Sequence, residues 1–235
     1  MKAAIAKTKN VMMAFDAYQS CVEACDAGSP ALAMFTGEAG LGKTTAGGFL
    51  FSQADGVLVR CLRSDTLGTF LERLAQDLGL DRRQRRADML NFIVHELVLQ
   101  NKPVFIDEAD YIADRTDVLE TIRDIYDIAN VPIILIGYAA LPRKVKRLPQ
   151  LFSRIAQHVE FQPADSEDIR IMASALVTEC QIDIDLLEEL LATSKGSFRR
   201  IHTGLDNIEK FARSNGIKQV SAAHWGEQSF FPVVR

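Results

Sequence analysis

The sequence lacks the residue patterns that make a metal centre or a disulfide framework. Its four cysteines form no CxxC pair, and none has a histidine at zinc-ligand spacing. They are Cys21, Cys25, Cys61 and Cys180. The four histidines are dispersed along the chain, and we expect them to be solvated or hydrogen-bonded. We therefore expect reduced structural thiols rather than zinc ligands or disulfides.

Long hydrophobic runs are also missing. No apolar run approaches the roughly 18 uninterrupted residues of a membrane span, and the opening MKAAIAKTKN lacks the apolar core of a signal peptide. We therefore expect a cytoplasmic protein without membrane partners. With 235 residues, 48% of them hydrophobic and 25% charged, the chain is long enough for one large domain or for a large and a small one.

An excess of positive charge is absent too. The net charge of −4 argues against a protein that binds nucleic acid through bulk basicity alone. Two local clusters are basic, one made of Arg82, Arg83, Arg85 and Arg86, the other of Arg143, Lys144, Lys146 and Arg147. Both are compatible with solvated turns, but neighbouring cations repel one another and are better tolerated beside an anionic polymer. Because no aromatics interleave with them, contact with phosphates is favoured over stacking on single-stranded bases.

The most informative motif is GEAGLGKT at residues 37–44. It lies between an apolar run at 31–35 and a helix-forming segment from Thr44, as a GxxxxGKT phosphate-binding loop does. Its glycines let backbone N–H groups surround an anion, and the following helix adds the positive end of its dipole. Lys43 is expected to reach the β- and γ-phosphates, and the Thr44 hydroxyl to join a Mg²⁺ shell. We predict an ATP site that includes Gly37, Glu38, Ala39, Gly40, Leu41, Gly42, Lys43, Thr44 and Thr45.

A second motif, VFIDE at residues 104–108, has the pattern of a Walker B strand. Its continuous apolar run is typical of a parallel strand buried on both faces, and it ends in two carboxylates. Asp107 is expected to hold Mg²⁺, and Glu108 to orient and deprotonate the attacking water. Two acids after a strand also cap helices, but their place downstream of a complete phosphate loop favours the catalytic interpretation.

Strand and helix patterns alternate up to residue 161. Apolar runs predict strands at 31–35, 56–62, 104–108, 133–136 and 158–161, and amphipathic spacing predicts helices at 10–27, 66–78, 84–100 and 116–129. Such alternation specifies an α/β fold with a parallel sheet flanked by helices. From Asp165 onward the pattern predicts helices only. We expect an N-terminal helical segment at 1–30, a nucleotide-binding domain at 31–163, a small all-helical lid at 164–215 and a tail at 216–235.

A phosphate loop, a strand ending in Asp-Glu, a further buried strand and a helical lid together resemble the AAA+ ATPases. The resemblance implies that Arg154, in LPQLFSR, is an arginine finger that reaches the γ-phosphate of the neighbouring subunit. It also implies that Arg199, in GSFRR, senses nucleotide in its own subunit. An ordinary surface position is the alternative for both arginines. One position departs from the family, because Tyr138 stands where a polar sensor, often Asn or Thr, is usual, so we expect slow or partner-dependent hydrolysis.

Within the AAA+ proteins the chain resembles the transposition ATPases, the family of the phage Mu B protein and of the small ATPases that accompany DDE transposases. The likeness covers about residues 10–215 and rests on GEAGLGKT, IGYAALP, QLFSRI and GSFRRI. The phage Mu protein carries an N-terminal helix-turn-helix domain, whereas only residues 1–30 precede the first predicted strand here. We therefore expect any DNA contacts to come from the ATPase body.

The resemblance implies an ATPase that assembles head to tail into a homo-oligomer on double-stranded DNA, without strong sequence preference, and recruits or activates a DDE transposase. We expect a filament rather than a closed ring, with ATP between the phosphate loop of one subunit and Arg154 of the next. Two alternatives stay open. One is a helicase loader or replication initiator of the same fold. The other is a weakly hydrolysing ATP switch, which Tyr138 favours and Glu108 disfavours.

Overall fold

Five parallel strands form the central sheet of the structure, a computed structural model that describes residues 1, 4–80 and 86–232, without the side chains of residues 86 and 87. The strands lie in the order β2-β3-β4-β1-β5, and every neighbouring pair is parallel. They are β1 (Leu32–Thr36), β2 (Val57–Arg60), β3 (Val104–Asp107), β4 (Ile133–Ile136) and β5 (Ile155–Glu160). The carboxyl ends of all five strands therefore meet at one edge of the sheet.

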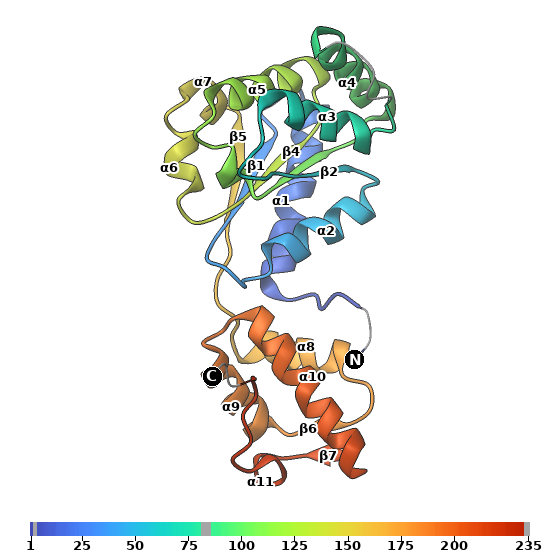
Figure 1. Ribbon diagram of the computed structural model, residues 1–235, viewed down its shortest axis with the longest axis vertical. Coiled ribbons are helices and arrows are strands. Elements are labelled where there is room, and N and C mark those ends of the chain that lie inside the picture. The colour runs from blue at the N-terminus through green and yellow to red at the C-terminus, as the bar shows by residue number, and fades with distance from the viewer. Residues whose placement is uncertain (2–3, 81–85, 233–235) are drawn as a thin grey trace. The chain divides into compact units, whose positions relative to one another are not determined.

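Helices flank this sheet, as the alternating sequence pattern predicts (Figure 1). They are α1 (Lys9–Asp26), α2 (Lys43–Gln53), α3 (Leu67–Asp77), α4 (Arg86–Gln100), the 3-10 turn η1 (Ala109–Tyr111), α5 (Thr116–Ala129), α6 (Leu141–Val145) and α7 (Pro149–Phe152). The predicted α/β class with a parallel sheet is confirmed. Among the residues that are described, no helix is both long and apolar enough to cross a membrane.

The inner and outer strands differ in burial, which explains how well the sequence marks them. β1, β3 and β4 are buried along their whole length, so their sequences are unbroken apolar runs. β5 is an outermost strand of the sheet, and most of its residues are half-buried or exposed. It begins at Ile155, three residues before the predicted start at 158, because polar Gln157 and His158 break the apolar run.

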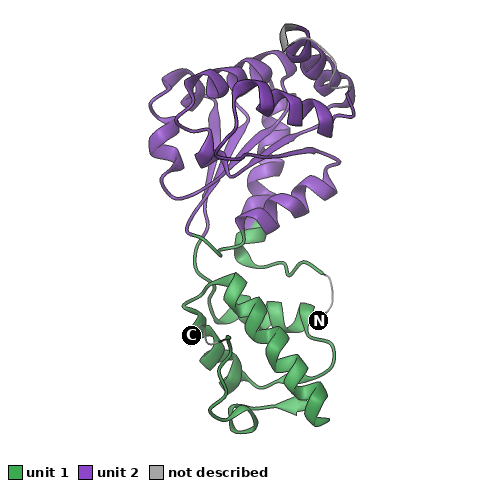
Figure 2. Ribbon diagram, in the orientation of Figure 1, with its two compact units in different colours: residues 1–12, 39–42, 162–235 green, residues 13–38, 43–161 purple. Residues whose placement is uncertain are grey.

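The described chain divides into two compact units (Figure 2). The α/β unit contains residues 13–38 and 43–161, and the helical unit contains residues 1–12, 39–42 and 162–235. Helix α1 contributes to both units, and so does the GEAGLGKT segment. Four residues of that segment, 39–42, group with the helical unit.

The helical unit is built on α8 (Ser166–Leu176), α9 (Ile184–Ser194) and α10 (Phe198–Asn215), with two short strands, β6 (Gln181–Ile182) and β7 (Gln219–Val220), and α11 (Ala222–Trp225). Ile201, Leu205 and Ile208 of α10 are fully buried in its core. The apolar tail joins the same core, where the Trp225 and Phe230 rings stack with centroids 5.3 Å apart. Residues 216–232 thus belong to the helical unit.

Candidate active site

The phosphate loop follows β1 directly and leads into α2. Gly42 has a φ of 90°, in the left-handed region where a side chain is strained, so the turn depends on glycine there. The ammonium of Lys43 donates to the carbonyls of Gly37 and Glu38, at 2.7 and 2.8 Å. Burial lowers the pKa of Lys43, while nearby carboxylates, Asp110 first among them, oppose that shift. The lysine is thus folded over its own loop, where an anionic ligand would compete with two neutral carbonyls.

The tip of the loop makes contacts inside the helical unit. The Gly40 carbonyl accepts the backbone N–H of Arg199 at 3.2 Å, and a Cβ on Gly40 would lie 2.6 Å from the hydroxyl of Ser197. The Leu41 carbonyl accepts the side-chain amide of Asn10 at 3.2 Å. Asn10 is 1% exposed and also exchanges two hydrogen bonds with the backbone of Gln162. Carbonyls at the tip are therefore bound by protein donors.

The Walker B strand places Asp107 beside the loop helix. The Thr44 hydroxyl donates to Oδ1 of Asp107 at 3.3 Å, and the Glu108 N–H donates to the same oxygen at 3.0 Å. Burial raises the pKa of Asp107, which is 4% exposed. A hydroxyl and a carboxylate are the hard oxygen ligands that Mg²⁺ prefers, so this pair fits the predicted ion. Within the described part of the chain, no cluster of three or more metal-binding side chains exists, so phosphate and water oxygens would complete the shell.

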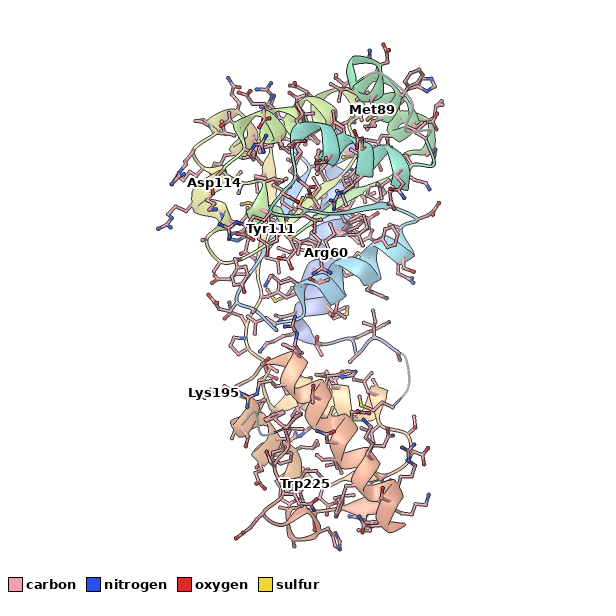
Figure 3. All side chains as sticks on the ribbon, viewed as in Figure 1. Arg60, Met89, Tyr111, Asp114, Lys195 and Trp225 are labelled. Atoms are coloured by element: carbon pink, nitrogen blue, oxygen red, sulfur yellow. The ribbon has the colours of Figure 1, made fainter. Side chains whose placement is uncertain are left out.

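Glu108 has an unusual backbone and a charged partner. Its φ of 56° and ψ of 38° are left-handed, a conformation that is uncommon for a residue other than glycine and that clusters at functional sites. One Glu108 oxygen lies 3.4 Å from a guanidinium nitrogen of Arg60. Arg60, labelled in Figure 3, is the last residue of β2. The pairing of β2 with β3 sets Arg60 opposite Asp107, which explains how Arg60 reaches the next residue. The candidate general base is therefore in an ion pair.

A third carboxylate, Asp110, fixes the segment that follows β4. It accepts the backbone N–H of Tyr138 at 2.5 Å, and a Cβ on Gly137 would collide with the same carboxylate. Glycine at 137 is therefore required for this close approach. The Tyr138 ring lies 5.3 Å from the Lys43 ammonium, a cation–π distance, and is 44% exposed. Tyr138 is thus beside the loop lysine, but its polar sensor role stays a prediction.

Arg154 lies at the opposite edge of the sheet from the phosphate loop. Its carbonyl accepts the N–H of Leu32, the first residue of β1, at 3.0 Å, whereas the loop follows the last residue of β1. Five strand residues rise roughly 16 Å. The guanidinium forms a fork with Asp127 of α5, with Nε–Oδ1 at 2.6 Å and Nη2–Oδ2 at 2.7 Å, and this hydrogen bonding raises the pKa of Arg154. Nη1 donates to the Gln150 carbonyl at 2.5 Å.

The structure describes the side chains of only one of the two basic clusters. Arg82, Arg83 and Arg85 lie outside the described residues, as does the side chain of Arg86. In the second cluster, Lys144 and Arg147 are paired with Asp114 at 2.6 and 3.6 Å, and the hydrogen bond from Lys144 lowers the pKa of Asp114. Arg143 and Lys146 are exposed, and neither forms an ion pair with a described residue.

Sequence reasoning missed four polar residues around these sites. Asn10, Arg60, Asp110 and Asp127 belong to no motif, and each meets its partner through the fold rather than through spacing. Arg199 is exposed, and its guanidinium has no ion pair with a described residue, so the lid role stays a prediction. A weak signal for Arg60 was available, because a charge near the end of a predicted strand falls at the edge where ligands bind.

Comparisons with known proteins agree with this fold. A family model described as an AAA domain matches residues 27–145. A relative from Staphylococcus aureus, described as a potential ATP-binding protein, is 28% identical over 151 residues, which is 61% of this chain and 52% of the relative. The chain therefore spans about half the length of that relative.

Two solved structures extend the match over both units. The Aeropyrum pernix ORC2 protein, in ADPNP and ADP complexes, has a TM-score of 0.77 and 17% identity over 95% of this chain and 68% of that chain. The Aeropyrum pernix ORC1 protein in complex with DNA has a TM-score of 0.63 and 16% identity over 92% of this chain and 63% of that chain. At these identities the matches establish the fold alone.

Proposed function

Because the chain belongs to the AAA family of P-loop ATPases, we propose that it binds ATP with Mg²⁺ and hydrolyses it in the cytoplasm. Residues 31–163 act as the nucleotide-binding domain and residues 164–215 as its lid. Backbone N–H groups of the phosphate loop and the Lys43 ammonium bind the phosphates. Thr44 and Asp107 hold Mg²⁺, which when bound neutralises charge on the phosphate oxygens. This assignment is supported by the adjacent Thr44 and Asp107 oxygens, 3.3 Å apart.

Glu108 orients the attacking water and accepts its proton. To do so its carboxylate leaves Arg60, which is feasible because that pair has a single contact of 3.4 Å and Arg60 is 66% exposed. Asp110 fixes the backbone at Tyr138, which in turn keeps the phenol beside Lys43. A phenol is farther from the backbone than the amide of Asn, so turnover is slow unless a partner aligns the water.

We propose further that hydrolysis requires a second copy of the chain. The observation that supports this requirement is the position of Arg154, which lies beside the first residue of β1 at the amino edge of the sheet. The length of β1, roughly 16 Å, separates it from its own phosphate loop. Arg154 therefore serves the γ-phosphate of a neighbouring subunit, and Arg199 senses nucleotide in its own. Such head-to-tail contacts build a filament or a ring, and we favour a filament.

Two substitutions test the ATPase assignment. Lys43→Ala abolishes ATP binding because the cation facing the phosphates is lost, whereas Glu108→Gln retains binding but loses turnover. Equilibrium binding of a fluorescent ATP analogue and phosphate release measure the two properties separately. Wild-type turnover by Glu108→Gln would falsify the catalytic assignment.

We propose that the assembly coats double-stranded DNA without strong sequence preference and recruits or activates a DDE transposase. The basic clusters support DNA contact, and the likeness to transposition ATPases supports the transposase. Arg143 and Lys146 are the strongest described candidates, since Lys144 and Arg147 already share Asp114. Replacing Arg143 and Lys146 with alanine flattens the log–log salt dependence of DNA binding by about 0.9 for each phosphate that the protein no longer neutralises. An unchanged slope would mean that this cluster is a solvated surface that does not contact DNA.

A replication initiator or helicase loader is the second candidate, supported by the fold match to ORC proteins, one of them in complex with DNA. Copurification with a transposase or with a replicative helicase separates the two. A third candidate, a non-hydrolysing ATP switch, is supported by Tyr138 at the sensor position. Turnover measured with duplex DNA present decides it, because a switch shows none above the Glu108→Gln background.

A further inference from the structure

We propose that Asp127 competes with the nucleotide for Arg154, so that the fork between them keeps the arginine from acting until a second copy of the chain docks. This inference rests on the proposed function, in which Arg154 reaches the phosphate of a neighbouring subunit. It assigns a regulatory role to a residue outside the phosphate loop and the Walker B strand. The occupant of the surface around Arg154 is a second copy of this chain.

The geometry of the fork supports competition. Both carboxylate oxygens of Asp127 accept from the guanidinium, at 2.6 and 2.7 Å, and the third nitrogen donates to the Gln150 carbonyl at 2.5 Å. Every nitrogen of the guanidinium is thus engaged within its own subunit. A planar guanidinium offers the same two parallel donors to a carboxylate as to a phosphate. One N–H of Nη2 is left over, but it cannot form that paired contact alone, so a phosphate that binds the Nε/Nη2 edge through two bonds must displace Asp127.

The pair is also exposed enough to exchange. Arg154 and Asp127 side chains are 30% and 36% exposed, so water and an incoming anion reach both. Two apolar side chains lie close to them in sequence: Ile128, which follows Asp127, is 63% exposed, and Phe152, two residues before Arg154, is 37% exposed. Helices α5 and α7, which carry these residues, pack against each other. Exposed apolar side chains beside an arginine are typical of a surface that another protein covers.

Asp127→Asn tests the competition, since the amide keeps the shape but loses the charge. We expect the protein concentration for half-maximal ATP turnover to fall about fivefold, the magnitude of an exposed ion pair. Sedimentation with ATP should show assembly at correspondingly lower concentration. In an Arg154→Ala background, where turnover is lost, the Asp127→Asn change should leave the protein concentration for ATP-dependent assembly in sedimentation unchanged, which a merely structural role of Asp127 would not predict.

Asp124→Asn is the matched control. Asp124 lies on the same helix and pairs with Arg123 at 2.5 Å, so its loss removes a comparable ion pair without touching Arg154. It should leave the half-maximal concentration unchanged. If Asp127→Asn is unfolded at the assay temperature, Asp127→Glu replaces it, because the longer side chain keeps the charge but alters the fork. A smaller shift of the same sign is then expected.

The outcomes separate this inference from the proposed function. If Arg154→Ala alone turns over ATP at the wild-type rate, the finger assignment fails, and the competition fails with it. If Arg154→Ala is silent but neither Asp127 variant lowers the half-maximal concentration, the finger stands and the competition is overturned. The competition is also overturned if Asp124→Asn produces the same shift as Asp127→Asn.

Discussion

The two edges of the sheet hold their candidate catalytic charges in different ways. At the carboxyl edge, Glu108 meets Arg60 through one contact of 3.4 Å, and its backbone is left-handed. At the amino edge, Arg154 is bound by Asp127 through two bonds of 2.6 and 2.7 Å. At the carboxyl edge the Glu108 carboxylate is only weakly paired. At the amino edge the Arg154 guanidinium is paired at two nitrogens with a carboxylate of its own subunit. We therefore expect Glu108 to leave its partner more easily than Arg154 does.

The largest effect should come from breaking the amino edge. Arg154→Ala is expected to lower ATP turnover by roughly 10³-fold or more, because in GTPases an arginine supplied in trans accelerates hydrolysis by at least that factor. ATP binding by the isolated subunit should be unchanged, since the loop lies at the other edge. Phosphate release and nucleotide titration measure the two quantities. If this variant kept its turnover, hydrolysis would not depend on Arg154 of a second subunit.

A smaller effect should follow from opening the pair at the carboxyl edge. Arg60→Ala frees Glu108 from an exposed partner, so turnover per site is expected to rise by up to about fivefold, as suits an exposed ion pair. Arg63→Ala is the control, since Arg63 is exposed and forms no ion pair with a described residue. A loss of turnover in Arg60→Ala alone would instead give Arg60 a productive role in hydrolysis.

The smallest effect concerns stability and compares an Asp→Asn change at each edge. Burial raises the pKa of Asp107, so its folded-state pKa lies above the unfolded value and stability falls as pH rises between them. At neutral pH the buried charge costs stability, and Asp107→Asn should raise the Tm of the nucleotide-free protein by about 2–4 °C for roughly 1 kcal/mol recovered. Both recorded hydrogen bonds end on Oδ1, which asparagine keeps.

Asp127→Asn should do the reverse and lower the Tm slightly, because that carboxylate is paired and exposed. Thermal unfolding of both variants at pH 7 gives the comparison. The Tm gain of Asp107→Asn should also shrink at lower pH, where the wild-type carboxyl takes up a proton and its burial cost disappears. A lower Tm for Asp107→Asn at neutral pH would mean that the carboxylate is stabilised by its neighbours.

Motifs at the carboxyl edge could be found in the sequence because they are local. The phosphate loop and the Walker B strand each lie within eight consecutive residues, and glycine, lysine and paired acids are each needed there for a physical reason. The parallel sheet followed from the alternation of buried runs with amphipathic helices. The short strands β6 and β7 were missed because two residues carry no periodic pattern.

Partners at both edges could not be predicted because they depend on long-range packing. Asn10 meets Gln162 across 152 positions, and Arg60 meets Glu108 only through the register of β2 on β3. Asp127 meets Arg154 because α5 ends at the amino edge, where β5 begins. Apart from the place of Arg60 near the end of a predicted strand, none of these contacts is indicated by composition or spacing. The sequence therefore reveals the candidate catalytic groups better than the groups that restrain them.

Mixing two inactive variants tests most directly whether each active site combines the two edges of different subunits. Glu108→Gln lacks the base but keeps Arg154, and Arg154→Ala lacks the arginine but keeps Glu108. If sites form head to tail between copies, an equimolar mixture should recover about a quarter of wild-type turnover, because one random junction in four pairs an intact base with an intact arginine. A mixture that co-assembles, as sedimentation would show, yet stays as inactive as either variant alone would contradict the account.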